Sequence, residues 1–183
     1  MSTPSAPRWR VTTGRQDPDT VARLLALLPG WFGIKASNTA YVESARALPT
    51  YLAWPADIGD DCAAEMVAGR TAQRNAQSAR TDPVGVLLAK RHFPEAAEIY
   101  LMAVDPALHR QGAGRALVEA LTADLIADGC RLLQVKTQGP SHPDAGYALT
   151  RRFYHALGFL PVEETADPWG PENPCLILIR VLA

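Results

Sequence analysis

The most informative segment of this chain reads Val104-Asp-Pro-Ala-Leu-His-Arg-Gln-Gly-Ala-Gly-Arg-Ala-Leu117. It follows an apolar run, Ile99 to Val104, of the kind that forms a buried strand. The chain then turns at Asp105-Pro106, gathers basic and glycine residues, and continues with apolar residues at helical spacing. A strand, a turn and the start of a helix are therefore predicted in direct succession.

The turn in this segment has the composition of an anion-binding site. A helix N-terminus presents backbone N–H groups that have no intrahelical partner, and the helix dipole favours negative charge there. Gly112 and Gly114 lack a Cβ atom, so a ligand can approach the backbone closely. Arg110 and Arg115 add positive charge. We interpret the turn as a pyrophosphate-binding site.

A purely structural role for the same turn stays open, because Gly-x-Gly before a helix is often only a tight turn. Two common nucleotide-binding patterns are incomplete here. Leu117 stands where the third glycine of the dinucleotide fingerprint would fall, and no Gly-Lys-Ser/Thr follows as in a Walker loop. A nucleotide-binding domain is therefore disfavoured.

The composition predicts one globular domain over residues 1–183, since 48% of the residues are hydrophobic. A net charge of −1 gives no basic surface for nucleic acid or for an anionic membrane. No segment is long enough to span a bilayer. Cys62, Cys130 and Cys175 form no CxxC pair, so neither a zinc site nor a disulfide framework is indicated, and a cytoplasmic location is expected.

The hydrophobic patterns predict a mixed-sheet α/β domain with the element order β-α-α-β-β-β-α-β-α-β-β. The expected elements are strand Trp9–Thr13, helix Pro18–Leu28, helix Ser37–Ala47, strands Pro49–Trp54, Pro83–Ala89 and Glu98–Val104, helix Gly112–Asp128, strand Arg131–Thr137, helix Tyr147–Leu157, and strands Phe159–Val162 and Cys175–Leu182. A loop is expected at His92–Glu95. The polar segment 57–82 is predicted to be an inserted loop with a short helix around Cys62–Ala68.

A second motif, Arg151-Arg-Phe-Tyr-His-Ala-Leu-Gly-Phe159, lies beyond the next predicted strand. Together with His109-Arg-Gln-Gly-Ala-Gly114 and the element order, it resembles the GNAT superfamily of N-acetyltransferases over nearly the whole chain. That family binds acetyl-CoA through an Arg/Gln-x-x-Gly-x-Gly/Ala loop and carries a tyrosine shortly before a Gly-Phe pair. The resemblance implies a mostly antiparallel central sheet, splayed between its fourth and fifth strands and flanked by helices.

The resemblance also implies where acetyl-CoA binds. The helix N-terminus would hold the pyrophosphate, and the pantetheine arm would pair like an added strand with the strand that ends at Val104. Two positions depart from the family pattern, because His109 replaces the usual Arg or Gln and Tyr147 replaces a common Asn. The implied cofactor-binding residues are Met102, Ala103, Val104, His109, Arg110, Gln111, Gly112, Ala113, Gly114 and Arg115, with Tyr147 or Thr150 supplying a hydroxyl.

Acetyl transfer to an amine requires a general base, because the amine must lose a proton before it can attack. Glu98 occupies the place on its strand where histone-acetylating members carry a catalytic glutamate. Simple strand alternation puts it on the same face as Tyr100, Met102 and Val104. A carboxylate at an exposed strand end is the alternative, and Glu95 is a weaker candidate base. The resemblance assigns Tyr154 as the acid that protonates the departing thiolate, while a buried structural tyrosine is the alternative.

The acceptor is expected to be an amine of a small molecule or a peptide. The resemblance brings it in opposite CoA, near Trp31, Phe32, Tyr41, Glu43 and Trp169, although Trp31 and Phe32 also suit a core position. No metal-ligand spacing is visible. Family members often dimerise through late strands, which would be Cys175 to Leu182 here. A non-catalytic acyl-CoA sensor is the alternative function, and the presence of both Glu98 and Tyr154 favours the enzyme.

Overall fold

The computed structural model describes residues 8–56 and 82–183, so the predicted insertion at 57–82 lies outside the described residues except for Asp82. The element order confirms the predicted one, with a short 3₁₀ helix added before α4. The elements are β1 (Trp9–Thr12), α1 (Pro18–Ala26), α2 (Lys35–Ser44), β2 (Thr50–Pro55), β3 (Gly85–Phe93), β4 (Ala96–Val104), η3 (Pro106–Leu108), α4 (Ala113–Ala127), β5 (Leu132–Gln138), α5 (Ala145–Ala156), β6 (Leu160–Thr165) and β7 (Cys175–Val181).

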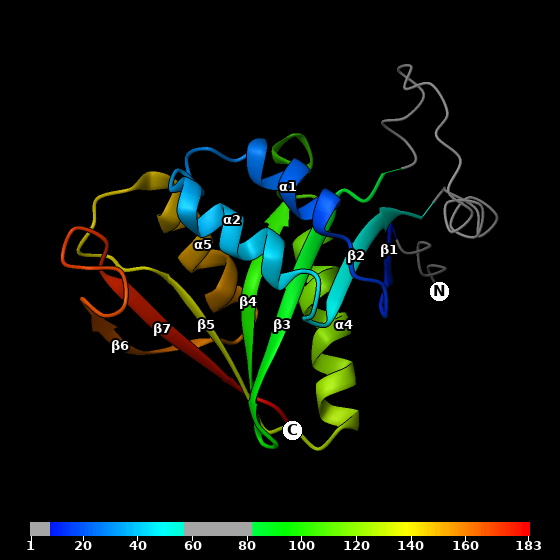
Figure 1. Cartoon of the computed structure of the whole chain (residues 1–183). Helices are drawn as coiled ribbons and strands as arrows, with labels where there is room; N and C mark the ends of the chain where they lie inside the picture. Colours follow the sequence, from blue (N-terminus) through cyan, green and yellow to red (C-terminus); the bar gives the residue numbers. More distant parts are fainter. Residues whose placement is uncertain (1–7, 57–81) are drawn as a thin grey trace, which may run out of the picture.

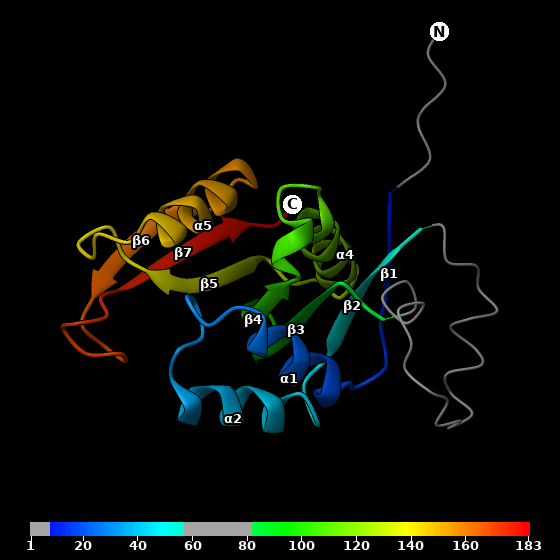
Figure 2. The same cartoon turned by 90° about the horizontal axis from the view of Figure 1, so that it is seen from above.

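The strands form one seven-stranded sheet in the order β1-β2-β3-β4-β5-β7-β6. Every neighbouring pair is antiparallel except β4 and β5, which run parallel. Helices α1 and α2 lie on one face of the sheet and α4 and α5 on the other (Figures 1 and 2). The mixed, mostly antiparallel α/β fold predicted from the sequence is confirmed.

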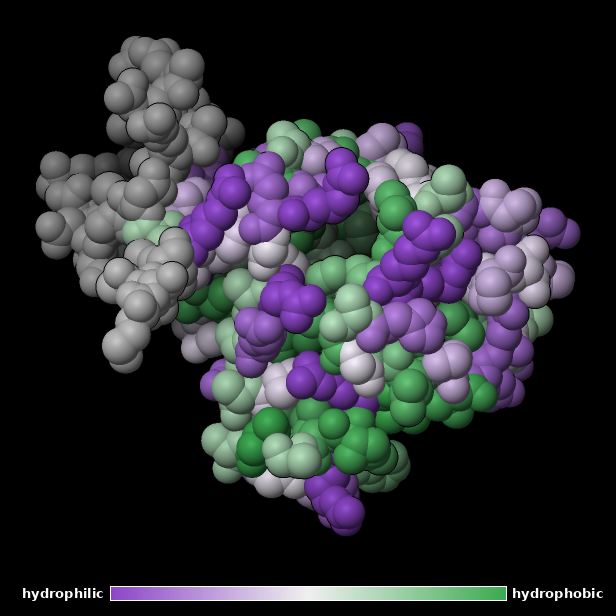
Figure 3. Space-filling view, turned by 180° about the vertical axis from the view of Figure 1, so that it is seen from behind, coloured by the Kyte–Doolittle hydropathy of each residue, from purple (hydrophilic) through white to green (hydrophobic). Residues whose placement is uncertain are grey.

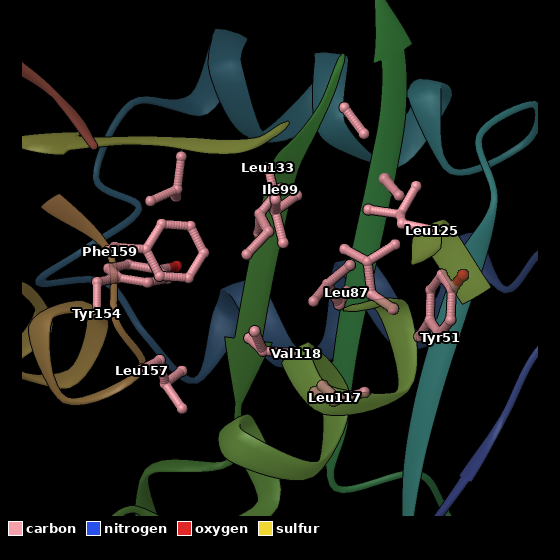
Figure 4. Packing of buried hydrophobic residues seen from close by; sticks show 14 of the residues in the cluster. Tyr51, Leu87, Ile99, Leu117, Val118, Leu125, Leu133, Tyr154, Leu157 and Phe159 are labelled. Carbon is pink, nitrogen blue, oxygen red and sulfur yellow. The ribbon is translucent and has the colours of Figure 1, made fainter. Parts of the chain in front are cut away.

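Two hydrophobic clusters fill the space between the sheet and its helices. The larger cluster joins the sheet to α4 and α5, and it holds Leu117, Val118, Leu133 and Phe159 with no exposed surface (Figure 4). The smaller cluster lies under α1 and α2. Among the helices of the described ranges, none is long and apolar enough to cross a membrane.

Helix α4, which follows the central turn, is flanked by glycines because the backbone at both ends has positive φ. Gly112 caps the N-terminus of α4 with φ +96°, and Gly129 follows its C-terminus with φ +73°. Both values lie in the left-handed region that L-residues with a side chain rarely adopt, so glycine suits each end. At α1 the predicted cap is confirmed, because the side chain of Asp17 accepts a hydrogen bond from the N–H of Thr20.

Two expectations about the central hairpin are wrong. The predicted loop at 92–95 is shorter, because His92 and Phe93 continue β3 and only two residues turn the chain before Ala96. Simple alternation also fails along β4, since Leu101 pairs with Leu88 while Ile99 pairs with Ala89, which leaves Tyr100 as an extra residue. Such a bulge reverses the faces that follow it.

The bulge separates side chains that were expected on one face. Glu98 and Tyr100 lie on the face covered by α1 and α2, where Tyr100 packs against the smaller cluster. Met102 and Val104 pack against the larger cluster on the opposite face. The sequence alone did not reveal this, because an extra strand residue leaves no gap in the apolar pattern.

Candidate active site

Strands β4 and β5 diverge, and the space between their diverging backbones is here called the cleft. The ladder between them runs only from Ala96–Leu132 to Ile99–Val135, after which β4 pairs with β3 alone and β5 with β7 alone. Figures 1 and 2 show the two strands separating beyond this point. The splay implied by the family resemblance is therefore present.

The inner edge of β4 offers backbone groups to this cleft. The N–H of Asp105 donates to the carbonyl of Val84, the residue directly before β3, so by strand alternation the backbone groups of Met102 and Val104 face the opposite edge, toward β5. Ala103, between them, faces β3. Of the three cofactor-binding residues predicted on this strand, Met102 and Val104 can therefore pair with an extended ligand through their backbone.

The turn at the start of α4 lies at the open end of this cleft, directly after η3. The indole nitrogen of Trp9 donates to the carbonyl of Gln111 at 2.7 Å, which ties β1 to the turn. Arg110 adopts φ +59°, an uncommon conformation for a residue with a side chain, and its side chain is exposed like that of Arg115. A Cβ added at Gly114 would meet the Phe153 ring at 3.3 Å.

These features fit a diphosphate group. Helix α4 is fifteen residues long and carries no side-chain cap, so the first N–H groups after Gly112 are available to an anion. Two exposed arginine side chains flank them. Figure 3, seen from the side of α4 and α5, shows a recess in the upper part of this face, bordered by hydrophilic side chains and floored by more hydrophobic ones.

His109 holds the turn together from within. Its Nε2 atom lies 2.9 Å from the carbonyl oxygen of Val104, which closes the segment between the end of β4 and the start of α4. The ring also meets Trp31 edge to face, with centroids 5.9 Å apart. The position that usually carries Arg or Gln in the family thus supports the backbone of β4 in this chain.

Trp31 links the loop between α1 and α2 to helix α5. Its indole nitrogen donates to the hydroxyl of Thr150 at 3.3 Å, and the Tyr147 hydroxyl donates to the Trp31 carbonyl at 2.8 Å. The ring also lies 3.0 Å from the position that a Cβ at Gly146 would take. Three residues predicted from the sequence, Trp31, Tyr147 and Thr150, therefore come together beside the cleft, and burial raises the pKa of Tyr147 to about 12.

Tyr154 lies on the inner side of α5, between the helix and the sheet. It is 4% exposed and meets Phe153 and Phe159 edge to face. In Figure 4 its hydroxyl oxygen points from α5 toward the strand that carries Ile99, which is β4. Burial raises the pKa of Tyr154 well above its ordinary value, so the phenol stays protonated at neutral pH.

Glu98 is 5% exposed and is held by three neighbouring side chains. Its carboxylate accepts hydrogen bonds from Lys136 Nζ at 2.9 Å and Gln134 Nε2 at 3.3 Å, and it lies 2.6 Å from His92 Nε2. Burial alone would raise the pKa of Glu98, but the hydrogen bonds from Lys136 and His92 and the charge of Lys136 lower it on balance.

The residues predicted to bind the acceptor divide into two groups. Tyr41 meets Phe32 and Tyr100 edge to face at 6.0 and 5.4 Å, on the face of the sheet that carries Glu98. Glu43 lies on the exposed side of α2 in an ion pair with Arg46. Trp169 is 40% exposed in the segment between β6 and β7. Tyr41 and Phe32 therefore lie with Tyr100 against the smaller cluster, whereas Glu43 and Trp169 have exposed side chains.

Sequence reasoning missed the partners of Glu98 and the contact from Trp9. Gln134 and Lys136 are polar residues that alternate with the apolar Leu133 and Val135, which was an available signal for a polar site on one face of β5. His92 had no comparable signal, since it was expected in a loop. Its position follows from a bulge in β3, between the pairs Arg91–Ala97 and Phe93–Ala96.

Comparisons with known proteins agree with this geometry. A family model described as "Acetyltransferase (GNAT) family" matches residues 38–159. A GNAT-family protein from Desulfovibrio desulfuricans has 19% identity and a TM-score of 0.68, with 96% of this chain and 98% of that chain covered. The ribosomal-protein-S18-alanine N-acetyltransferase from Escherichia coli has 15% identity and a TM-score of 0.64, with 96% and 94% covered.

A GNAT family acetyltransferase from Elizabethkingia anophelis, solved with acetyl-CoA bound, has 16% identity and a TM-score of 0.59, with 96% of this chain and 99% of that chain covered. At these identities the structural likeness establishes the fold alone. Among curated protein sequences, none matches this chain.

Proposed function

This chain belongs to the GNAT family of acetyltransferases, which use acetyl-CoA, and we propose that it transfers an acetyl group to an amine of a small molecule or peptide. The observation that supports this most directly is the open backbone edge of β4 at the start of the cleft, directly before the glycine turn of α4. Met102 and Val104 would pair with the pantetheine arm there. The backbone of 110–115 would hold the pyrophosphate.

In the proposed reaction the amine attacks the thioester carbonyl directly, within a complex of both substrates. The N–H of Val104 would donate to the thioester oxygen, which gains negative charge in the transition state. Stabilisation of such an oxyanion by a fixed donor is usually the largest single contribution to catalysis. Tyr154 would give its proton to the departing thiolate, and its burial supports this role by keeping the phenol protonated. Glu98 would take the proton of the amine, directly or through water.

The acceptor would approach from the side of α1 and α2, because Glu98 lies on that face of the sheet. Tyr41 and Tyr100 line this approach with aromatic surface, which suits an amine on an apolar body. The chain would act in a reducing compartment such as the cytoplasm, since Cys130 and Cys175 are both free and buried. A homodimer through the late strands is also proposed, and the exposed side chains of Leu160, Val162 and Val181 support it.

The test is release of free CoA from acetyl-CoA in the presence of tyramine, spermidine, an aminoglycoside, free amino acids and a short peptide with a free N-terminus. An acetyltransferase releases CoA with at least one amine and forms the N-acetyl product in equal amount, as mass spectrometry would show. The alternative function is a non-catalytic acyl-CoA sensor. One observation supports it, namely that three donors already occupy the carboxylate of Glu98. A sensor would bind acetyl-CoA in calorimetry and release no CoA with any amine.

A further inference from the structure

The carboxylate of Glu98 has one permanent cation and one titratable neighbour. Lysine as a residue type carries its charge at neutral pH, whereas histidine is the side-chain type that changes charge between pH 5 and 8. His92 Nε2 lies 2.6 Å from Glu98 Oε2, and Lys136 Nζ lies 2.9 Å from Oε1. Protonation of His92 therefore places a second positive charge against a carboxylate that is 5% exposed.

The contact between His92 and Glu98 lies between two irregularities in the strands that carry these residues. His92 is the extra residue of a bulge in β3, and Tyr100 is the extra residue of a second bulge in β4, two positions after Glu98. Bulges re-aim side chains and recur next to active sites. His92 also lines a cavity of about 170 Å³ together with Phe93, Leu132 and Ile179, and its side chain is 30% exposed. The imidazole can therefore exchange protons with solvent directly.

We propose that His92 is a positioning residue that controls Glu98, which accepts the proton of the amine efficiently only while His92 is neutral. This inference rests on the proposed acetyl transfer. With His92 charged, two cations hold the carboxylate and its tendency to take another proton is weak. With His92 neutral, only Lys136 opposes proton uptake, and the imidazole N–H still orients the carboxylate.

The proton balance of the reaction is unaffected by this control. An ammonium acceptor first loses one proton through Glu98 to solvent, and the C–N bond then forms as the neutral nitrogen attacks. The C–S bond breaks and the thiolate receives one proton from Tyr154. The proton that the nitrogen loses after its attack balances the one that restores the Tyr154 phenol, so one proton in all is released per ammonium acceptor. Other groups around the pair are Lys90 on β3, whose ammonium lies 5.6 Å from the centroid of the Tyr100 ring, Gln134 on β5, Tyr41 on α2 and Cys175 on β7.

The experiment compares the pH dependence of kcat for the wild type, His92→Gln and His92→Arg with the fastest amine of the panel above. Glutamine keeps a neutral donor at every pH, and arginine keeps a positive charge. We expect His92→Gln to match the wild type near pH 8 and to exceed it by about tenfold near pH 5.5, because a neutral neighbour leaves the carboxylate the stronger base. His92→Arg should be about tenfold slower than the wild type at pH 8.

The exposed His155, on α5, provides the matched control, since His155→Gln should follow the wild-type profile. If His92→Gln and His92→Arg reduce kcat by the same factor at every pH, His92 has only a structural role and the proposal is overturned. A wild-type profile retained in His92→Gln would overturn it as well.

A second readout does not depend on turnover. In protein labelled with ¹³C at glutamate carboxyl carbons, the Glu98 signal should shift as His92 titrates in the wild type, and this step should disappear in His92→Gln. A Glu98 signal without that step overturns the proposal. If the wild type releases no CoA with any amine, the proposed acetyl transfer itself is overturned. The positioning role proposed for His92 in that reaction is then overturned too, even if the carboxyl signal shows that Glu98 responds to the charge of His92.

Discussion

Glu98 shows how a single buried charge depends on residues that strand pairing brings to it. Lys136 is on another strand, and His92 reaches the carboxylate only through a bulge. An isolated carboxylate at 5% exposure would be strongly disfavoured in its ionised form, so the three donors allow it to stay charged. The position of Glu98 followed from the resemblance, whereas its surroundings did not, because strand pairing sets them.

The lowered pKa of Glu98 leads to a prediction about acid stability. A carboxyl group whose pKa is below its ordinary value of 4.5 in the folded state stabilises the fold above that value. The contribution is lost as the pH falls through the lower, folded-state pKa. The difference in unfolding free energy between the wild type and Glu98→Gln should therefore shrink as the pH falls from about 5.5 to below about 4.5. Urea denaturation at pH 7, 5.5, 4.5 and 3.5 measures it, and a difference independent of pH would contradict the prediction.

Tyr154 and Tyr51 form a matched pair for separating catalysis from stability, since both belong to the larger hydrophobic cluster. We expect Tyr154→Phe to lower kcat roughly 100-fold and to leave the Kd for acetyl-CoA unchanged, because only a proton donor is removed. Tyr51→Phe removes a 2.9 Å hydrogen bond to Asp124 and should cost about 1 kcal/mol of stability with kcat intact. Steady-state kinetics measures kcat, and calorimetry measures the Kd for acetyl-CoA and the stability of both variants. An unchanged kcat in Tyr154→Phe would exclude Tyr154 as the acid.

At the scale of elements, the helix that starts at Gly112 provides a test with its own internal control. Gly112→Asp places bulk and negative charge at the N-terminus of α4, so acetyl-CoA binding should weaken at least 100-fold through loss of the diphosphate site. Gly129→Asp introduces the same side chain at the other end of the same helix, again at positive φ. It should show a similar loss of stability and normal binding. Equal affinity in the two variants, measured by calorimetry, would place the diphosphate elsewhere.

Elements with local signals were the most predictable part of the fold. The cap at Asp17, the glycine at 129 and the apolar spacing of α4 each act within a few residues, so they fix helix ends from sequence alone. The two bulges in the β3–β4 hairpin depend on pairing between strands, and the one at Tyr100 reversed the expected face of Met102 and Val104 relative to Glu98. The missed residues of the site, Lys136 and His92, depend on the same pairing.

On the scale of the whole molecule, the sheet consists of two halves that share a short ladder. Strands β1 to β4 carry one edge of the cleft and strands β5 to β7 the other, and they are joined by the pairs from Ala96–Leu132 to Ile99–Val135 (Figure 1). The family resemblance implied this division between the fourth and fifth strands. The loops that flank the cleft are held by contacts such as Trp31 with Thr150, which span more than a hundred residues and carry no local signal.

This architecture predicts an alternating pattern of amide hydrogen exchange along β4. The N–H groups of Leu101 and Ala103 face β3, whereas those of Met102 and Val104 face the cleft. In the free protein Met102 and Val104 should therefore exchange faster than their two neighbours, because water reaches them. Acetyl-CoA at saturating concentration should slow Met102 and Val104 by at least tenfold in the wild type and leave them unchanged in Gly112→Asp. Residue-resolved exchange by NMR measures all four amides, and equal protection of the four on binding would show that the ligand stabilises the fold without pairing with this strand.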